Sequence, residues 1–181
     1  MASQGPETVR CAGPAAAGGT ILLVEDDEPL ARALSRMIAA GGYDVVHANS
    51  GGAAIANVRA RSFQAVLSDL NLPDWCGVDV LRAARAHDTD VPLVLMTGCP
   101  TMETAIAAVS LGVLEYLVKP MSTDQLARVL GRASKLRRAG GLTSRARTAA
   151  PAEARRLVGG RPSWPPLARL SPEFQQLDAE E

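Results

Sequence analysis

Four short hydrophobic runs in this chain each end in residues whose side chains can take part in chemistry. The runs and the residues that follow them are 21–24 with Glu25, Asp26 and Asp27; 65–68 with Asp69; 93–96 with Thr97; and 114–118 with Lys119. If the runs are parallel strands of one sheet, their carboxyl ends meet at one edge. The carboxylates, the hydroxyl and the amine gathered there can together bind a metal ion and a phosphoryl group.

The carboxylates of Asp26, Asp27 and Asp69 would face one another, which is unfavourable unless a cation lies among them. Such oxygen ligands suit Mg²⁺, which keeps several waters and uses a few carboxylates together with phosphate oxygens. A carboxylate at this place can also attack phosphorus and form an aspartyl phosphate. Lys119 would neutralise the new phosphoryl group, and Thr97 would donate a hydrogen bond to it. The sequence therefore predicts a magnesium-dependent phosphoryl site.

The elements that must position these residues alternate between strand and helix. The predicted strands cover residues 20–24, 44–48, 64–68, 91–96 and 113–118, and the predicted helices cover residues 28–40, about 51–60, 77–86, 101–111 and 122–138. The strands are continuous apolar runs, the pattern of a parallel sheet that is covered by helices on both faces. Alternating strands and helices with right-handed crossovers predict a doubly wound α/β fold.

Composition restricts the classes of partner and the compartment. The 19 basic and 19 acidic side chains balance, so no net field attracts nucleic acid or an anionic membrane. No apolar stretch approaches the roughly 20 residues that span a bilayer. The three cysteines are widely spaced and form no metal or redox motif. We therefore expect a cytoplasmic protein with no membrane partner and no direct binding to nucleic acid.

Domain boundaries follow from shifts in composition. Residues 1–19 are rich in Ala, Gly and Pro and predict a flexible leader without a signal peptide. Residues 20–138 carry the alternating elements and predict one domain. Residues 139–181 begin with Gly140 and Gly141 and are then rich in Arg, Ala and Pro, with too few large apolar residues for a core. We predict that this tail is largely disordered.

The motifs, taken in order, resemble the receiver domain of response regulators in bacterial two-component signalling, the family of the chemotaxis regulators. The matching pieces are Val24-Glu25-Asp26-Asp27-Glu28, Ser68-Asp69-Leu70-Asn71-Leu72-Pro73, Gly77, Met96-Thr97-Gly98, Gly112 and Val118-Lys119-Pro120. The resemblance covers residues 20–138. It implies a flavodoxin-like three-layer sandwich with a five-stranded parallel sheet of strand order 2-1-3-4-5.

The resemblance also implies a role for each acidic residue of the site. Asp69 would accept a phosphoryl group from a histidine kinase or a phosphotransfer protein. Asp26 and Asp27 would hold Mg²⁺ together with Asp69, and Asp27 would be the more direct ligand of the two. The backbone carbonyl of Asn71 would complete the protein's share of the coordination.

Further roles are implied for the residues at the last two strands. Lys119 would bind the phosphoryl oxygens, and a cis peptide bond between Lys119 and Pro120 would place its ammonium group. Thr97 would move toward the phosphoryl group while Tyr116, the aromatic switch residue, fills the vacated space. The domain would act on its own phosphorylation and dephosphorylation and would not be an enzyme for an external substrate.

The resemblance also implies an output surface, formed by the fourth helix, the fifth strand and the fifth helix, for a homodimer or an effector protein. The fourth helix is apolar around much of its girth, and the fifth carries Arg128, Arg132 and Lys135 at one-turn spacing. The two histidines, His47 and His87, have no partner at metal-ligand spacing. We therefore predict structural roles for both, with His47 on the second strand and away from the site.

Three alternatives remain open from the sequence. An aspartyl-phosphate phosphatase would use similar residues, but the haloacid-dehalogenase pattern has an acid two residues after the nucleophile, where this chain has Asn71. A DNA-binding regulator would need two amphipathic helices with a tight turn, which residues 139–181 lack. The chain would also fit a receiver fragment of a longer signalling or DNA-binding regulator without its output domain.

Overall fold

The computed structural model describes residues 18–149, and its side chains through residue 139. Its elements are β1 (Thr20–Val24), α1 (Glu28–Ala40), β2 (Asp44–Ala48), α2 (Gly51–Ala60), β3 (Ala65–Asp69), α3 (Gly77–His87), β4 (Leu93–Thr97), α4 (Met102–Leu111), β5 (Glu115–Val118) and α5 (Thr123–Ala149). The predicted leader, apart from residues 18 and 19, and the part of the predicted tail beyond residue 149 lie outside the described residues.

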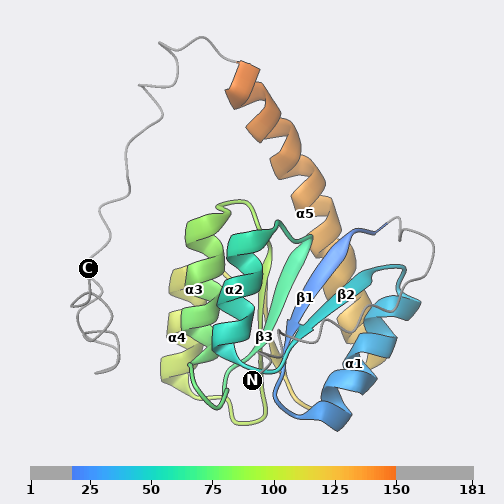
Figure 1. The fold of residues 1–181 in the computed structure, drawn as a ribbon, viewed down its shortest axis with the longest axis vertical. Coiled ribbons are helices and arrows are strands. Elements are labelled where there is room, and N and C mark those ends of the chain that lie inside the picture. The colour runs from blue at the N-terminus through green and yellow to red at the C-terminus, as the bar shows by residue number, and fades with distance from the viewer. Residues whose placement is uncertain (1–17, 150–181) are drawn as a thin grey trace, which may run out of the picture. The chain divides into compact units, whose positions relative to one another are not determined.

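All five strands pair in parallel in the order β2-β1-β3-β4-β5, which confirms the predicted sheet. In the ribbon, α2, α3 and α4 cover one face of this sheet, while α1 and α5 cover the other (Figure 1). In the sheet, β2 lies on one side of β1 and β3 lies on the other, so the direction in which successive strands are added reverses at β1. This reversal is the topological switch point, where doubly wound folds bind their ligands at the carboxyl ends of the strands.

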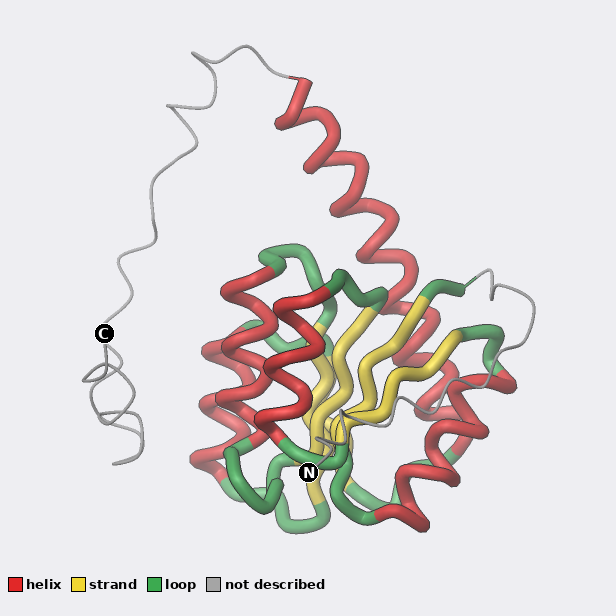
Figure 2. The backbone as a smooth tube through the Cα atoms, viewed as in Figure 1, coloured by secondary structure: helices red, strands yellow, loops and turns green. Residues whose placement is uncertain are grey.

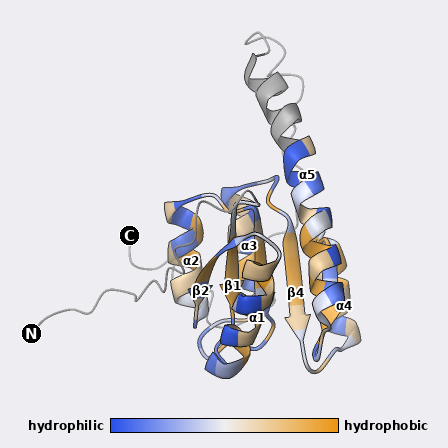
Figure 3. Ribbon diagram, turned by 90° about the vertical axis from the view of Figure 1, so that its right-hand side faces the viewer, coloured by the Kyte–Doolittle hydropathy of each residue, from blue (hydrophilic) through white to orange (hydrophobic). Residues whose placement is uncertain are grey.

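Two hydrophobic cores hold the three layers together. Leu22 and Val24 of β1 face the core beneath α2, α3 and α4, whereas Ile21 and Leu23 face the core beneath α1 and α5. Both kinds of position are fully buried in β1, which is therefore apolar on both faces, and β1 and β4 appear orange in the hydropathy view (Figure 3). Burial on both faces explains why continuous apolar runs, rather than alternating ones, marked the strands in the sequence.

Local capping sets where the helices begin and end. Asp27 has extended backbone angles and its Oδ1 accepts a hydrogen bond from the backbone N–H of Leu30 at 2.9 Å, so it is the N-cap of α1. Helix α4 begins with a capping box between Thr101 and Thr104. It ends at Gly112, whose left-handed backbone (φ 67°) is the usual conformation of a glycine at this position. These caps fix the angles at which the loops at the strand ends enter the helices.

Helix α5 extends beyond its predicted end at residue 138 and continues to Ala149. The sequence interpretation took Gly140 and Gly141 as a stop, but a glycine inside a helix costs only about 1 kcal/mol relative to alanine. The chain divides into a compact unit of residues 1–144 and a second unit of residues 145–181. Only residues 145–149 of the second unit are described, and they continue the helix.

Candidate functional site

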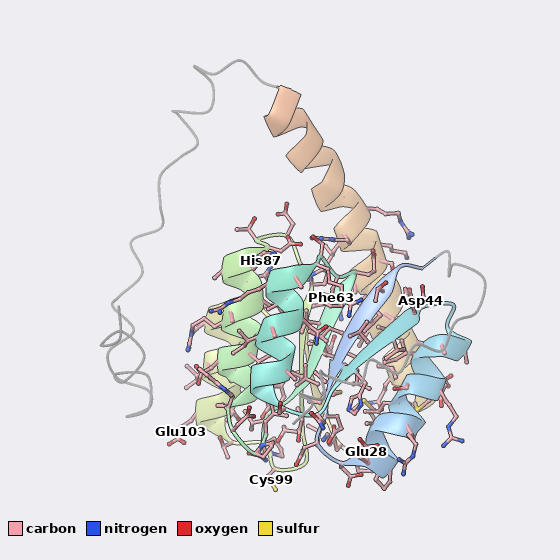
Figure 4. All side chains as sticks on the ribbon, viewed as in Figure 1. Glu28, Asp44, Phe63, His87, Cys99 and Glu103 are labelled. Atoms are coloured by element: carbon pink, nitrogen blue, oxygen red, sulfur yellow. The ribbon has the colours of Figure 1, made fainter. Side chains whose placement is uncertain are left out.

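The polar residues that follow the strands gather at one edge of the sheet. The tube view shows the loops at that edge, directly after the yellow strands (Figure 2). With all side chains drawn, Glu28 and Cys99 lie at this edge, while Asp44, Phe63 and His87 lie at the opposite edge (Figure 4). His87 is therefore remote from the candidate site, consistent with the structural role predicted for it.

Three carboxylates form a cluster at the ends of β1 and β3. One carboxylate oxygen from each of Glu25, Asp26 and Asp69 lies within 4.8 Å of the others. Glu25 and Asp69 are buried, whereas Asp26 is exposed. A set of hard oxygen donors, buried on one side and open to solvent on the other, fits Mg²⁺, which needs water or phosphate oxygens in its remaining positions.

Asp27 does not belong to this cluster, contrary to the prediction that it is the more direct metal ligand. Its Oδ1 caps helix α1 through the N–H of Leu30, and the carboxylate that joins those of Asp26 and Asp69 is that of Glu25. The acidic run therefore enters the site one residue earlier than predicted. The physical reason is the start of α1 at Glu28, which leaves Asp27 in the N-cap position.

Lys119 joins the two buried carboxylates. Its Nζ donates to Glu25 Oε2 at 2.7 Å and lies 3.0 Å from Asp69 Oδ1. Burial alone would lower the pKa of Lys119, but the contacts with Glu25 and Asp69 outweigh burial and raise this pKa above its ordinary value. The ammonium therefore stays charged beside the predicted phosphoacceptor, where an added phosphoryl group would need a counter-charge.

The buried position of Glu25 is electrostatically unfavourable for its ionised carboxylate. Burial raises the pKa of Glu25 above its ordinary value, and the charge of Asp69 adds to that rise, while the contacts with Lys119 only partly offset it. One ammonium thus faces more than one carboxylate. The excess negative charge is what a divalent cation would neutralise.

A backbone hydrogen bond between the carboxyl ends of β4 and β5 places Lys119 next to Thr97. The N–H of Lys119 donates to the carbonyl of Thr97 at 2.7 Å. The peptide bond between Lys119 and Pro120 is cis, as predicted. The strand registers thus bring Asp69, Thr97 and Lys119 together at neighbouring strand ends.

The two predicted switch residues engage different partners. Thr97 is fully buried, and its Oγ1 accepts a hydrogen bond from the N–H of Cys99 at 3.1 Å. Tyr116 is half-buried, and its hydroxyl lies 2.8 Å from Oγ1 of Thr104 on α4. The hydroxyl of Tyr116 is therefore bonded to the first turn of α4, while its ring packs against the core.

Asn71 lies in the loop after β3 and forms an isolated antiparallel bridge with Cys76. It follows Asp69 by two residues in the chain. Its role as a metal ligand stays a prediction.

His47 is a neighbour of the site that the sequence interpretation missed. Its Nε2 lies 2.8 Å from the backbone carbonyl of Glu25, so the ring donates a hydrogen bond to that carbonyl. The prediction that His47 lies away from the site is wrong, because β2 pairs with β1 up to the last residue of both strands. A histidine one residue before the end of β2 was the available signal, but its contact depends on this register.

Comparison with known proteins places this geometry in a family. Residues 21–130 match the family described as the response regulator receiver domain. The chain belongs to the response regulator receiver domain family. The resemblance seen in the sequence is thereby confirmed, together with the predicted flavodoxin-like fold.

Curated relatives are regulators longer than this chain. The transcriptional regulatory protein ZraR of Escherichia coli O157:H7 is 36% identical over 113 residues, which are 62% of this chain and 26% of ZraR. The acid tolerance regulatory protein ActR of Rhizobium meliloti is 36% identical over 111 residues, which are 61% of this chain and 57% of ActR. The match thus spans about a quarter of ZraR and somewhat over half of ActR.

Solved structures of receivers share the fold. The receiver domain of the sensor histidine kinase PA1611 from Pseudomonas aeruginosa has a magnesium ion coordinated in its active-site cleft. It is 29% identical, with a TM-score of 0.60, and the match covers 66% of this chain and 99% of that one. The chemotaxis response regulator CheY4 of Vibrio cholerae is 26% identical, with a TM-score of 0.58, and the match covers 63% and 97%.

No helix in the described part of the chain is both long and apolar enough to cross a membrane.

Proposed function

We propose that this receiver is a magnesium-dependent phosphoacceptor that is phosphorylated on Asp69 by a histidine kinase or a phosphotransfer protein. One observation carries the proposal: the Lys119 ammonium lies 3.0 Å from a buried carboxylate oxygen of Asp69, beside a cluster of carboxylates. The nucleophile, its counter-charge and a set of metal ligands thus share one small volume. We also propose that the protein works in the cytoplasm, as receivers meet their kinases there.

The side chains have distinct parts in the transfer. A carboxylate oxygen of Asp69 forms a bond to phosphorus, while the bond from phosphorus to the donor's nitrogen or oxygen breaks and its electron pair leaves with the donor. Glu25, Asp26 and Asp69 would hold Mg²⁺, which when bound offsets the charge of the phosphoryl oxygens. Lys119 then shifts from the Asp69 carboxylate to the phosphoryl oxygens while keeping its bond to Glu25.

Phosphorylation at this site would also change the conformation of a distant surface. The Thr97 hydroxyl oxygen gives up the hydrogen bond that it accepts from the N–H of Cys99, and its O–H donates to a phosphoryl oxygen. Tyr116 then turns into the space that Thr97 leaves. Because the hydroxyl of Tyr116 is bonded to Thr104, this turn removes a hydrogen bond from the first turn of α4. The output of phosphorylation is thus a change in the surface formed by α4, β5 and α5.

That surface carries exposed apolar side chains, which fit a homodimer or an effector protein. The large hydrophobic residues exposed there are Met102, Ile106 and Val109 on α4, Val118 on β5 and Leu136 on α5. Apolar side chains gathered on one face commonly mark a protein interface. Arg128, Arg132 and Lys135 of α5 are also exposed, and Arg132 is paired with Glu115 of β5.

A second reading, a receiver portion of a longer regulator, is supported by the relatives. ZraR and ActR both extend beyond the matched region. In that case α5 would lead into an output domain, and the phosphoacceptor chemistry of residues 20–138 would be unchanged. The chain would act as a switch and not as an enzyme for an external substrate.

Intact-mass measurement with a small phosphodonor tests the proposal. We expect the wild type to gain the mass of one phosphoryl group when Mg²⁺ is present and none after chelation, and Asp69→Asn to gain none. Asp124→Asn, which removes a carboxylate in the first turn of α5, is the control and should behave as the wild type. An unchanged wild-type mass would refute the proposal, and sustained turnover of phosphomonoesters would favour the phosphatase.

A further inference from the structure

The loop between β3 and α3, residues 70–76, is attached to the N-terminus of α2 by a carboxylate. Oδ1 of Asp74 accepts a hydrogen bond from the N–H of Gly51 at 2.8 Å, and its Oδ2 accepts one from the N–H of Gly52 at 2.8 Å. Backbone N–H groups in the first turn of a helix have no partner within the helix. Asp74 therefore satisfies two of them from a different part of the chain, at the positive end of the helix dipole.

Trp75 attaches the same loop to α2 by close packing. A Cβ atom on Gly51 would lie 2.4 Å from Cβ of Trp75 and 2.7 Å from its Cγ, so a larger residue than glycine has no room there. The backbone of α2 can approach the loop this closely only because Gly51 lacks a side chain. The polar contact of Asp74 and the packing of Trp75 thus fix adjacent residues of the loop to the first turn of α2.

The ends of the loop are fixed as well. The N–H of Gly77 donates to the carbonyl of Leu70 at 2.8 Å, and Asn71 bridges to Cys76. A Cβ on Gly77 would lie 1.8 Å from the carbonyl oxygen of Asp69, so α3 begins in direct contact with the backbone of the phosphoacceptor. Backbone contacts thus hold both ends of the loop. Asp74 and Trp75 hold its tip against α2.

We infer that Asp74 is a positioning residue for the metal site: by holding the loop against α2, it places the backbone carbonyl of Asn71 toward the acidic cluster. This inference rests on the proposed function and on the ligand role that the family resemblance implies for the backbone carbonyl of Asn71. Groups outside a coordination sphere that orient its ligands commonly change metal affinity 10- to 100-fold when they are removed. Asp74 acts through the backbone of the loop and touches none of the proposed ligands by its side chain among the described contacts.

Helix α2 offers a matched control. Ser50 caps the same helix through its Oγ, which accepts from the N–H of Ala53, and among the described residues it forms no hydrogen bond with the loop. Ser50→Ala therefore removes a cap from α2 and leaves the loop attached. Asp74→Ala removes caps from the same turn and releases the loop. A general weakening of α2 would affect both variants alike, whereas a positioning effect belongs to Asp74 alone.

The test is a Mg²⁺ titration followed by the fluorescence of Trp75. The chain has two tryptophans, so both variants and the parent carry Trp164→Phe. We expect Asp74→Ala to raise the Kd for Mg²⁺ about tenfold, and Ser50→Ala to leave it within about twofold of the parent value. Hydrogen exchange without metal should be faster at residues 70–76 in Asp74→Ala than in Ser50→Ala.

The outcomes separate this inference from the proposed function. Equal Kd values for Asp74→Ala and the parent, or equal increases in both variants, would overturn the positioning role while the metal site stands. A parent protein with no saturable response to Mg²⁺, by fluorescence and by calorimetry, would overturn the proposed metal dependence and the positioning role with it. A selective rise in Kd together with faster exchange of the loop supports the inference.

Discussion

At the residue scale, the consecutive acidic residues that follow β1 have different roles. Glu25 turns inward to Lys119, Asp26 faces solvent at the edge of the cluster, and Asp27 caps α1. Each role follows from where the strand ends and the helix begins. A change of one residue in this register would exchange an interior ligand for a helix cap.

Glu25→Gln should reveal the cost of burying this carboxylate. Because the folded pKa of Glu25 is raised, the stability linked to Glu25 is fully present below its unfolded pKa and is lost as pH rises through the folded pKa. Without Mg²⁺, the glutamine variant should therefore gain stability relative to the wild type as pH rises above 4.5, the ordinary pKa of a glutamate side chain. Urea unfolding of both proteins across this range measures the difference.

The same comparison with saturating Mg²⁺ should reverse the order above that pH, because a bound cation favours the ionised carboxylate. Glu28→Gln, at an exposed position of α1 paired only with Arg32 in the described contacts, is the control and should show neither effect. A stability difference between wild type and Glu25→Gln that does not vary with pH would contradict the electrostatic account of Glu25.

The sequence located most of the site, and the exceptions have physical reasons. Asp69, Thr97 and Lys119 were predictable because each directly follows a buried run whose end the sheet aligns with the others. The place of Asp27 was available from capping rules, since Pro29 fits the first turn of a helix that Asp27 would then cap. The contact between His47 and the carbonyl of Glu25 could not be predicted from the sequence, because it depends on the register in which β2 pairs with β1.

At the element scale, the first turn of α4 is the part most directly tied to the switch. Thr104 shares its hydroxyl between the capping box with Thr101 and the hydroxyl of Tyr116. A turn of Tyr116 into the core must break the second of these contacts. In the proposed switch, helix α4 would therefore respond to the state of the site through the side chain of Thr104.

Thr104→Val should shift Tyr116 toward its inward position before any phosphorylation, because it removes the hydroxyl that holds the outward one. In protein labelled with 3-fluorotyrosine, the ¹⁹F resonance of Tyr116, assigned with Tyr116→Phe, should move toward its position in the phosphorylated wild type. Loss of the cap should also lower the free energy of unfolding by about 1 kcal/mol.

Thr101→Val is the matched variant, since it disrupts the same capping box and leaves the bond between Thr104 and Tyr116 possible. Its Tyr116 resonance should stay near that of the unphosphorylated wild type. Identical shifts in the two variants would show that general loosening of α4, and not the bond to Tyr116, controls the tyrosine.

Strands were more predictable than the end of the last helix. Fully buried parallel strands leave an apolar signal of four to six residues, and each predicted strand matches an observed one to within two residues. The end of α5 has no such signal, because Gly140 and Gly141 weaken a helix without preventing it. The hydrogen bonds from the first turn of α2 to Asp74 could not be predicted from the sequence either, since they join residues that only the fold brings together.

At the scale of the whole molecule, the receiver has a polar edge at the strand ends and exposed apolar side chains on α4. Met102, Ile106 and Val109 lie at spacings of four and three on α4, so they share one face of the helix. These residues are 76%, 58% and 80% exposed, which leaves three large apolar side chains of α4 available to a partner.

Ile106→Glu should abolish phosphorylation-dependent association while leaving phosphorylation of Asp69 intact. In sedimentation velocity, the phosphorylated wild type should sediment faster than the unphosphorylated protein, and the variant should not. Ala39→Glu, at an exposed position on α1, is the control and should behave as the wild type. A phosphorylated wild type that remains monomeric would exclude self-association through this surface.

Chemical trapping of the phosphorylated residue tests the central claim most directly. Borohydride reduces an aspartyl phosphate to homoserine, whose position is then read by peptide mass spectrometry after reaction with a phosphodonor and Mg²⁺. We predict homoserine at position 69 alone, dependent on Mg²⁺ and absent from Asp69→Asn. Homoserine at position 26 or 27, or no homoserine in wild-type protein incubated with the donor, would contradict the assignment of Asp69 as the phosphoacceptor.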